Sequence, residues 1–397
     1  MDNRYFPWIQ YPYISVSGRP SHVTGDFFIT TASRASDNRD REIGIPEIMG
    51  TFDQAQLAFS MKEAGLPIPA TFSPLLINAQ LPWAVKGKIQ AQGFAFSYQQ
   101  YLGYCFSIGL FGLIMRSNSS MEFFFNQSKA SALVDFDIVE LDLARRQMFE
   151  ILGLTCNHVY QAGLGDVDLY ARWCQHYEYC LKLRTIDYGL RVGMLLPTGV
   201  KHDINMPASV PFGGNGHWGV YASIDGEFEV KEDWKVGFLL RLSKRFAQTQ
   251  LQRMPVARVQ RENTVAESEP QIFGVVVGDA RINPGFSQAF FLYAQWEGIR
   301  EGLGVRVQYT LMNHSKDNWT DERVNKQVAV NIKQMENLSS WASEYFTLSA
   351  FYDFGKETKR CIAHPIVRVA WDIPYTLLVA HRFVYSYKVS LGLEFNF

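Results

Sequence analysis

The stretch YKVSLGLEFNF, residues 387–397, decides the fold of this chain. Its apolar side chains occupy every second position: Tyr387, Val389, Leu391, Leu393, Phe395 and Phe397. The positions between them hold Lys388, Ser390, Gly392, Glu394 and Asn396. Because successive side chains of a β-strand point to opposite faces, the alternation predicts a strand with one apolar face and one polar or charged face.

The same alternation recurs upstream, most clearly in Trp234–Leu242 and Leu303–Leu311. It predicts twelve strands, near residues 22–34, 87–99, 103–116, 163–174, 184–196, 217–229, 233–245, 286–297, 302–313, 342–355, 361–373 and 384–397. Residues 51–61 are a candidate for a further strand. Fourteen strands is therefore the alternative count, because single-chain bacterial barrels favour even numbers.

The composition indicates a membrane environment without helical spans. Aromatic residues make up 14% of the 397 residues and charged residues only 19%, and the formal net charge is -1. A helical membrane protein needs apolar runs of about 20 residues, whereas the longest run here is Ile108–Met115. We therefore expect an all-β fold, a transmembrane antiparallel up-and-down β-barrel, with a two-sheet soluble sandwich as the alternative. The near-zero charge gives no indication of a nucleic-acid partner.

The connections between the predicted strands alternate in length. Long connections span 35–86, 117–162, 197–216, 246–285 and 314–341, whereas those on the opposite side are short turns. Long outer loops and short periplasmic turns are typical of outer-membrane barrels. Residues 135–153 predict one short amphipathic loop helix, with acidic residues at its start and Gly153 at its end. The polar connection 246–285 is expected to be a solvated excursion.

Export and assembly follow as expectations from the barrel prediction. The first residues, MDNRYFPWIQ, show no basic and apolar signal segment, so a removed signal peptide is expected for a bacterial (Gram-negative) outer-membrane protein. Residues 387–397 resemble the C-terminal assembly signal of such barrels, which implies the barrel-assembly machinery and the lipid bilayer as partners. Residues 1–21 are expected to form an N-terminal arm or a plug in the lumen, and 22–397 a single barrel.

One segment resembles a known family. Residues 163–199 contain Gly163-Leu164-Gly165-Asp166, then Arg172, and a next strand that runs into Pro197-Thr198-Gly199. This segment is similar to a family of outer-membrane barrels annotated with the meta-pathway of phenol degradation, whose architecture is related to FadL-like channels. The resemblance covers about a tenth of the chain. It implies transport of small, often hydrophobic molecules and supplies no catalytic residues.

If the apolar faces meet lipid, the charged residues between them face the lumen, because a lipid-facing Arg or Lys near the bilayer centre costs about 2–4 kcal/mol. The predicted lumen or solute-pathway residues are Asp166, Asp168, Arg172, Asp187, Arg191, Asp225, Glu227, Lys235, Arg241, Arg306, Asp353, Arg368, Lys388 and Glu394. Their charges either line a narrow polar channel or pair with one another and fill the interior.

Sequence motifs give no sign of enzymatic, metal or cofactor chemistry. The chain has no GxSxG, HExxH or glycine-rich phosphate loop, and its histidines lack partner spacing. We therefore expect a porin-like channel for passive passage of small, possibly hydrophobic, solutes. The alternative is a structural or adhesive surface barrel whose long loops bind partners. An outer-membrane lipolytic enzyme is the third hypothesis.

Overall fold

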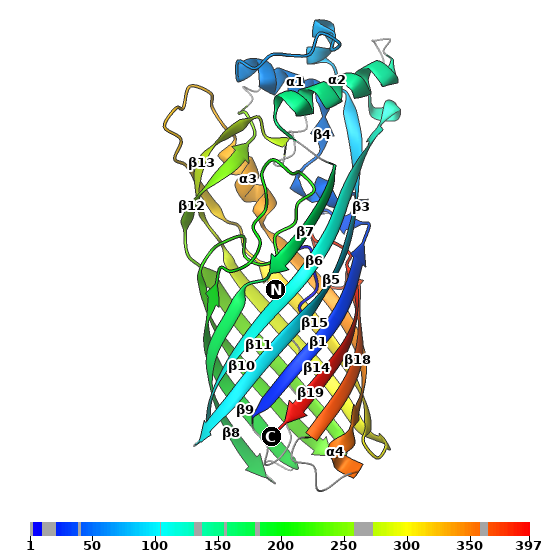
Figure 1. Cartoon of the computed structure of the whole chain (residues 1–397), viewed down its shortest axis with the longest axis vertical. Coiled ribbons are helices and arrows are strands. Elements are labelled where there is room, and N and C mark those ends of the chain that lie inside the picture. Colours follow the sequence, from blue (N-terminus) through cyan, green and yellow to red (C-terminus); the bar gives the residue numbers. More distant parts are fainter. Residues whose placement is uncertain are drawn as a thin grey trace.

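The computed structural model describes residues 3–9, 21–38, 41–103, 105–130, 137–154, 157–178, 183–257, 273–357 and 364–397. Twelve antiparallel strands close into a barrel with tilted walls (Figure 1). The strands are β1 (His22–Ala32), β5 (Pro82–Gly103), β6 (Phe106–Phe125), β8 (Val167–Glu178), β9 (Thr185–Leu196), β10 (Gly219–Lys231), β11 (Trp234–Arg245), β14 (Phe286–Arg300), β15 (Leu303–His314), β17 (Trp341–Asp353), β18 (His364–Tyr375) and β19 (Tyr387–Asn396).

Neighbours in the barrel are neighbours in chain order, and the first and last of these strands close the ring. β1 pairs with β19 from His22–Asn396 to Thr31–Tyr387, and its other edge pairs with β5. Each predicted strand matches one barrel strand, so the up-and-down barrel of twelve strands is confirmed. Two short strands, β4 (Phe52–Asp53) and β7 (His158–Leu164), extend the same sheet beyond the ring.

The apolar faces of the barrel strands point outward. In β19 the side chains of Val389, Leu391 and Leu393 are 54%, 52% and 48% exposed, whereas Lys388 and Glu394 between them are 0% and 4% exposed. This arrangement is the reverse of a soluble sandwich, whose apolar faces are buried. An apolar exterior on a closed barrel is the surface of a protein that spans the bacterial outer membrane.

Aromatic side chains lie on the outer wall toward both ends of the barrel. Trp234 and Trp296 stack with ring centroids 5.7 Å apart beside the short turns, and Phe346 packs on Tyr375 at 5.6 Å near the long connections. Such rings suit the two interfaces between hydrocarbon and headgroups. None of the helices among the described residues is long and apolar enough to cross a membrane.

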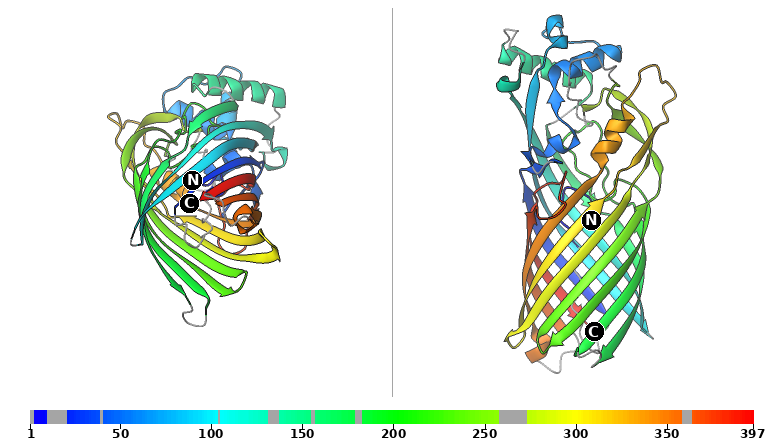
Figure 2. Two further views of the ribbon diagram at one scale, coloured as in Figure 1. Left: turned by 60° about the horizontal axis from the view of Figure 1, so that its bottom comes forward. Right: turned by 180° about the vertical axis from the view of Figure 1, so that it is seen from behind.

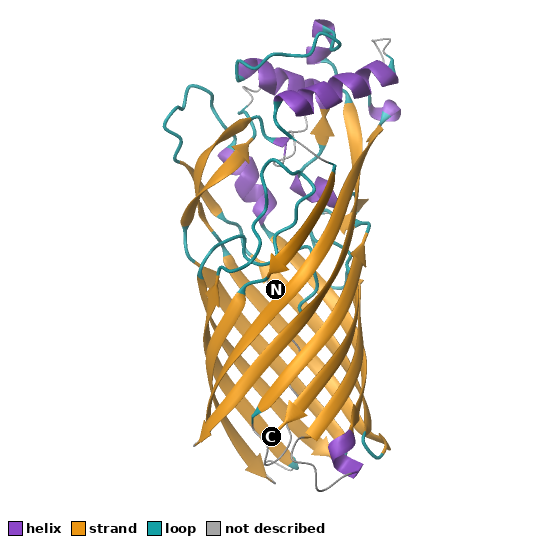
Figure 3. Ribbon diagram, viewed as in Figure 1, coloured by secondary structure: helices purple, strands orange, loops and turns teal. Residues whose placement is uncertain are grey.

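The long connections build a layer above one end of the barrel, as the side views show (Figures 2 and 3). It contains the helices α1 (Gln54–Glu63), α2 (Ile138–Ile151) and α3 (Ile332–Ser339), the 3-10 helices η1 (Ile45–Met49), η2 (Pro74–Asn78) and η3 (Gln127–Lys129), and the strands β2 (Ala35–Ser36) and β3 (Glu42–Ile43). The short helix α4 (Phe354–Glu357) lies at the opposite end.

Helix α2 confirms the predicted loop helix, but the expectation of only one loop helix was wrong, and so was the candidate strand at 51–61. Asp53 ends β4, and its carboxylate accepts a hydrogen bond from the backbone N–H of Gln56 at 3.1 Å, which caps α1. A capping aspartate stabilises a helix start. The alternation of residues 51–61 is too brief to outweigh this cap and the packing of α1 against the outer layer.

The connection 246–285 is more ordered than expected. Its described parts form β12 (Gln248–Met254) and β13 (Val276–Asn283), which join β16 (Asn318–Asp321) in a separate three-stranded sheet. The apolar residues Met254, Ala280 and Met335 are buried beneath this sheet. The described parts of the expected solvated excursion therefore form a structured wall above the barrel rim.

Candidate functional site

The inner wall carries a repeated pairing of arginine with tyrosine. The guanidinium groups of three arginines lie over tyrosine rings of the preceding barrel strand, with 4.3 Å between Arg191 and Tyr170, 3.5 Å between Arg241 and Tyr221, and 4.4 Å between Arg306 and Tyr293. Cations over aromatic faces are mutually stabilising. The rings lie flat on the wall because the neighbouring strand has a glycine beneath each ring.

Ion pairs join interior side chains of different strands. Arg241 on β11 contacts Asp168 on β8 at 3.1 Å, and Arg172 on β8 pairs with Asp225 on β10. Further pairs are Arg368–Asp26 at 2.7 Å, Lys388–Asp372 at 2.6 Å and Lys235–Glu297 at 3.0 Å. These charges need the pairing, since an unpaired charge in this interior would be costly.

The structure places the predicted lumen residues on the interior side or at its rim. Eight of them are buried: Asp168, Arg172, Arg241, Arg306, Asp353, Arg368, Lys388 and Glu394. The other six are partly exposed: Asp166, Asp187, Arg191, Asp225, Glu227 and Lys235. Asp166 differs from the rest because it precedes β8 and belongs to the loops above it.

Sequence reasoning missed partners in this interior. Asp26 pairs with Arg368, and Asp372 pairs with Lys388. Each aspartate is adjacent in sequence to an exposed aromatic residue, Phe27 or Trp371, so the alternation of the strand indicates that both aspartates face the interior. The interior tyrosines were missed because an aromatic residue on an alternating strand is first assigned to the lipid side. Their position opposite glycines of a neighbouring strand appears only with the strand register.

The contacts of the described N-terminal residues 3–9 place this segment in the interior of the barrel. The ring of Trp8 packs edge-on against Phe291 with centroids 5.4 Å apart, and Arg241 lies 5.0 Å from the centre of the Trp8 ring. The Lys388 ammonium donates to the backbone carbonyl of Trp8 at 3.1 Å. Phe6 is 1% exposed. The segment is thus held by both packing and hydrogen bonds.

A cavity of about 190 Å³ lies where this segment meets the outer loops. An apolar wall contains Tyr5, Ile282, Trp319 and Trp341, each from a different part of the chain. The lining also includes polar side chains, namely Arg4, Arg245, Arg253, His202, His217, His314 and Asp317. A dry cavity of about 150 Å³ accommodates benzene in another protein, so the volume suffices for one single-ring molecule.

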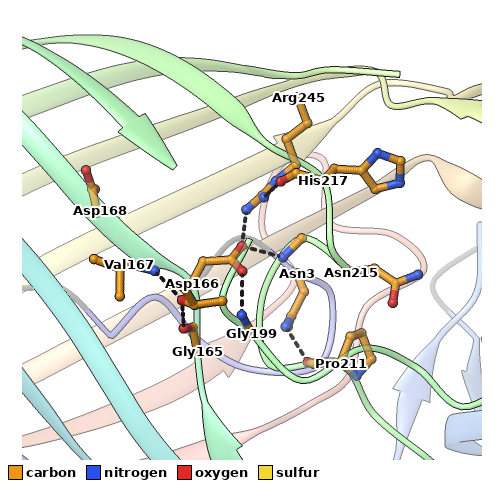
Figure 4. A network of polar contacts seen from close by, with 12 residues as sticks. Asn3, Gly165, Asp166, Val167, Asp168, Gly199, Pro211, Asn215, His217 and Arg245 are labelled. Carbon is orange, nitrogen blue, oxygen red and sulfur yellow. Dashed lines mark hydrogen bonds and ion pairs between the residues drawn. The ribbon is translucent and has the colours of Figure 1, made fainter. Parts of the chain in front are cut away.

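One carboxylate ties the cavity wall together (Figure 4). Asp166 accepts hydrogen bonds from the backbone N–H groups of Gly199 at 3.2 Å and Gly214 at 2.8 Å, and it forms a 2.9 Å ion pair with Arg245. The segment that carried the family resemblance therefore folds on itself, since Asp166 and Gly199 belong to its two ends. A side chain at Gly214 would overlap the Arg245 guanidinium, so this close approach requires glycine.

The cavity lining carries more positive than negative charge. The Arg253 guanidinium donates to the carbonyls of Leu152 and Ile204, both at 2.7 Å, and Arg4 donates to the carbonyls of Leu338 and Ser339. Backbone carbonyls orient these two cations without neutralising them. Burial lowers the pKa of His202, and burial together with Arg245 lowers the pKa of His217. Both imidazoles are therefore neutral near pH 7.

One lining residue, Trp319, contains a buried hydrogen-bond donor. The indole N–H of Trp319 is buried and has no hydrogen-bond partner among the residues that the structure describes. A buried N–H without an acceptor costs about 1–3 kcal/mol.

No protein-family model and no curated protein matches the chain. Solved structures with a similar fold include an outer-membrane channel from Pseudomonas putida F1, with 10% identity, 97% of this chain and 100% of that chain covered, and a TM-score of 0.49. The transport unit of the autotransporter AIDA-I from Escherichia coli shows 8% identity over 97% and 93%, with a TM-score of 0.37. The Pseudomonas putida toluene transporter TodX shows 8% identity over 95% and 89%, with a TM-score of 0.32.

At such low identity, the function of this chain has to be inferred from its own residues. The meta-pathway family suggested by residues 163–199 stays a prediction.

Proposed function

We propose that this protein admits small single-ring solutes that carry an acidic oxygen into the outer cavity and lets them pass inward through the barrel. The observation that carries the proposal is the cavity itself, in which Trp319 and Trp341 lie with Arg4 and Arg253. An apolar wall with a few convergent polar groups is the usual form of a small-molecule site. The proposal involves no covalent step.

The chemistry of the lining favours an amphipathic solute. Trp319, Trp341 and Ile282 would contact the ring, and the guanidinium groups of Arg4 and Arg253 would attract a carboxylate or phenolate. The buried indole N–H of Trp319, which has no partner among the described residues, becomes a further donor in this proposal once the ring turns toward the solute. A purely hydrocarbon solute would leave these polar groups unsatisfied and is expected to bind more weakly.

Most of the segment 1–21 lies outside the described residues, but its described part 3–9 acts in this proposal as a lumen plug rather than an arm along the wall. Of these residues, Tyr5 contributes to the cavity while Trp8 lies deeper, against Phe291 and Arg241. A solute leaving the cavity inward would meet this segment first. Displacement of Trp8 then exposes Arg241, which belongs to one of the arginine–tyrosine pairs of the inner wall.

Binding of three matched probes to the detergent-solubilised protein tests the solute class. Benzoate, benzyl alcohol and toluene share a ring and differ in the polar group, and calorimetry gives their affinities. We expect benzoate to bind tightest. Trp319→Phe keeps one aromatic ring and removes the N–H together with the pyrrole part of the indole, so benzoate affinity should fall by at least about 3–10-fold, the effect of one hydrogen bond. The smaller change expected for toluene measures the loss of ring contact alone.

Arg4→Met provides the second variant because it removes a cation and keeps a long apolar side chain. Lys62→Met, an exposed site on α1, is the matched control. Loss of benzoate binding in Arg4→Met alone supports the proposal. Equal affinity for all three probes, or no binding by a barrel that remains folded, contradicts it and favours the surface-binding alternative.

A further inference from the structure

The connection between β18 and β19 places three apolar side chains on the surface just beyond the wall of the barrel. Leu377, Leu378 and Val379 are 54%, 69% and 50% exposed. They begin two positions after Tyr375, whose ring packs against Phe346 at the outer aromatic girdle. A run of three exposed aliphatic residues at this height is suited to contact with lipid.

A buried carboxylate fixes this connection on the outer face of the barrel. Glu344 accepts hydrogen bonds from the backbone N–H groups of Leu377 at 3.0 Å, Leu378 at 3.0 Å, Val379 at 2.6 Å and Ala380 at 3.0 Å. Glu344 lies four positions before exposed Leu348 on β17, so the period of two places both on the outward face. The apolar residues therefore lie toward the membrane and not toward the lumen.

A basic recess adjoins these residues. It has a volume of about 620 Å³ and is lined by Lys316, His381 and Arg382 together with the amides of Asn38 and Asn337, and by Leu378 and Val379. The Lys316 ammonium donates to the side-chain oxygen of Asn337 at 2.7 Å, and Arg382 donates to the backbone carbonyl of the same residue. No carboxylate lines the recess among the described residues.

We propose that this recess binds a phosphate group of an anionic lipid in the outer leaflet, with the acyl chains of that lipid against Leu377–Val379. Two fixed cations and several amides offer the donors that a phosphate monoester needs. The neighbouring aliphatic residues offer the surface that an acyl chain needs. Both lie on the side of the long connections, which is the outer side of such barrels. A free phosphate ion would use the cations alone.

The recess shares no lining residue with the solute cavity, and a lipid bound there would anchor the barrel. A bound lipid would join the β15–β17 connection, through Lys316, to the β18–β19 connection, through Arg382. These two connections also hold Arg4 of the N-terminal segment. The Arg4 guanidinium donates to the backbone carbonyl of Leu338, and the backbone carbonyl of Arg4 accepts a hydrogen bond from the N–H of Val384. A lipid at the recess would therefore stabilise the rim against which the N-terminal segment rests.

Binding of lipid A to the full chain in phosphatidylcholine nanodiscs tests the assignment. The discs contain about one-tenth lipid A bisphosphate, its monophosphoryl form or a fully dephosphorylated form, and native mass spectrometry counts bound lipid. We expect retention of the bisphosphate form and about tenfold weaker retention in Lys316→Ala/Arg382→Ala, since each surface cation contributes to attraction of an anionic lipid. Arg382→Gln alone should show a smaller loss.

The control is Lys326→Ala/Lys333→Ala, which removes the same charge from exposed positions of the β15–β17 connection. It should bind as the unmodified chain does. Leu378→Ser should weaken lipid A binding. The concentration of inorganic phosphate that displaces lipid A from the recess measures phosphate binding, and the affinity for phosphate itself should stay unchanged in this variant. The proposal is overturned if the folded double variant retains lipid A as tightly as the control, or if inorganic phosphate alone binds as tightly as lipid A.

Discussion

Arg245 on β11 and Asp166 before β8 form an ion pair with 2.9 Å between Nη2 and Oδ2, and both side chains are less than a tenth exposed. Two backbone N–H groups also point at Asp166, so its carboxylate joins the turn before β8 to the β9–β10 connection, which lines the outer cavity. Removing one partner of such a pair leaves a buried charge without compensation, which is more destabilising than the loss of an exposed pair.

Asp166→Ala should therefore lower the stability of the barrel by about 3–5 kcal/mol. The urea midpoint of the purified protein, followed by its heat-modifiable mobility in gels, measures the effect. Glu42→Ala breaks the exposed Arg34–Glu42 pair and should cost less than about 1 kcal/mol. Similar losses in both variants would show that the Asp166 network does not hold the outer wall.

Acidification should loosen the outer cavity. His202 and His217 have a folded pKa below the ordinary value of about 6.5. The unfolded state therefore binds more protons than the folded state below about pH 6.5, and stability must fall as pH drops through that range. The urea midpoint should be higher at pH 7.5 than at pH 5.5. His202→Asn/His217→Asn should flatten this dependence, and an unchanged slope would assign it to other groups.

Gly193 on β9 lies beneath the ring of Tyr221, and a Cβ atom there would overlap that ring. Gly193→Val should displace Tyr221 and disturb the stacking of Arg241, costing about 1–3 kcal/mol as overpacking does. Ala222→Val adds a similar volume on the lipid face and serves as the control. Removing the ring as well, in Gly193→Val/Tyr221→Ser, should recover part of the loss. A variant as stable as the control would mean that the ring moves freely.

Leu391→Arg tests which way the apolar faces point. Leu391 is 52% exposed on the outer wall of β19. A charge at that position should cost about 2–4 kcal/mol if it lies near the bilayer centre. Folding into vesicles of phosphatidylcholine, measured against Leu391→Phe, gives the difference. Equal folding of the two variants would be incompatible with a lipid-facing Leu391.

Alternation with a period of two was sufficient to predict the barrel strands, because lipid on one side and a charged interior on the other enforce it on every strand. It also located the interior cations such as Arg241 and Lys388. It could not predict the outer layer, where no single periodicity dominates. Helix α1 depends on one capping aspartate, and the β12–β13–β16 sheet depends on contacts between connections far apart in sequence.

The cavity was beyond sequence reasoning for the same reason. Tyr5, His202, Arg253, Trp319 and Trp341 come from five segments, and only the closed barrel brings these segments to one place. The free N–H of Trp319 is likewise invisible in a sequence, since it depends on what surrounds the ring. Asp166 was predicted as a lumen residue, yet its binding to two glycine N–H groups required the folded loops.

Single-channel conductance in planar bilayers tests most directly whether the N-terminal segment closes a pathway through this barrel. The unmodified chain should show small conductance, because Trp8 lies against Phe291 and Arg241 in the interior. Phe6→Ala/Trp8→Ala should raise the conductance several-fold, while Phe27→Ala on the lipid face should not. Silent membranes with all three folded proteins would contradict the account and indicate a barrel whose interior is permanently filled.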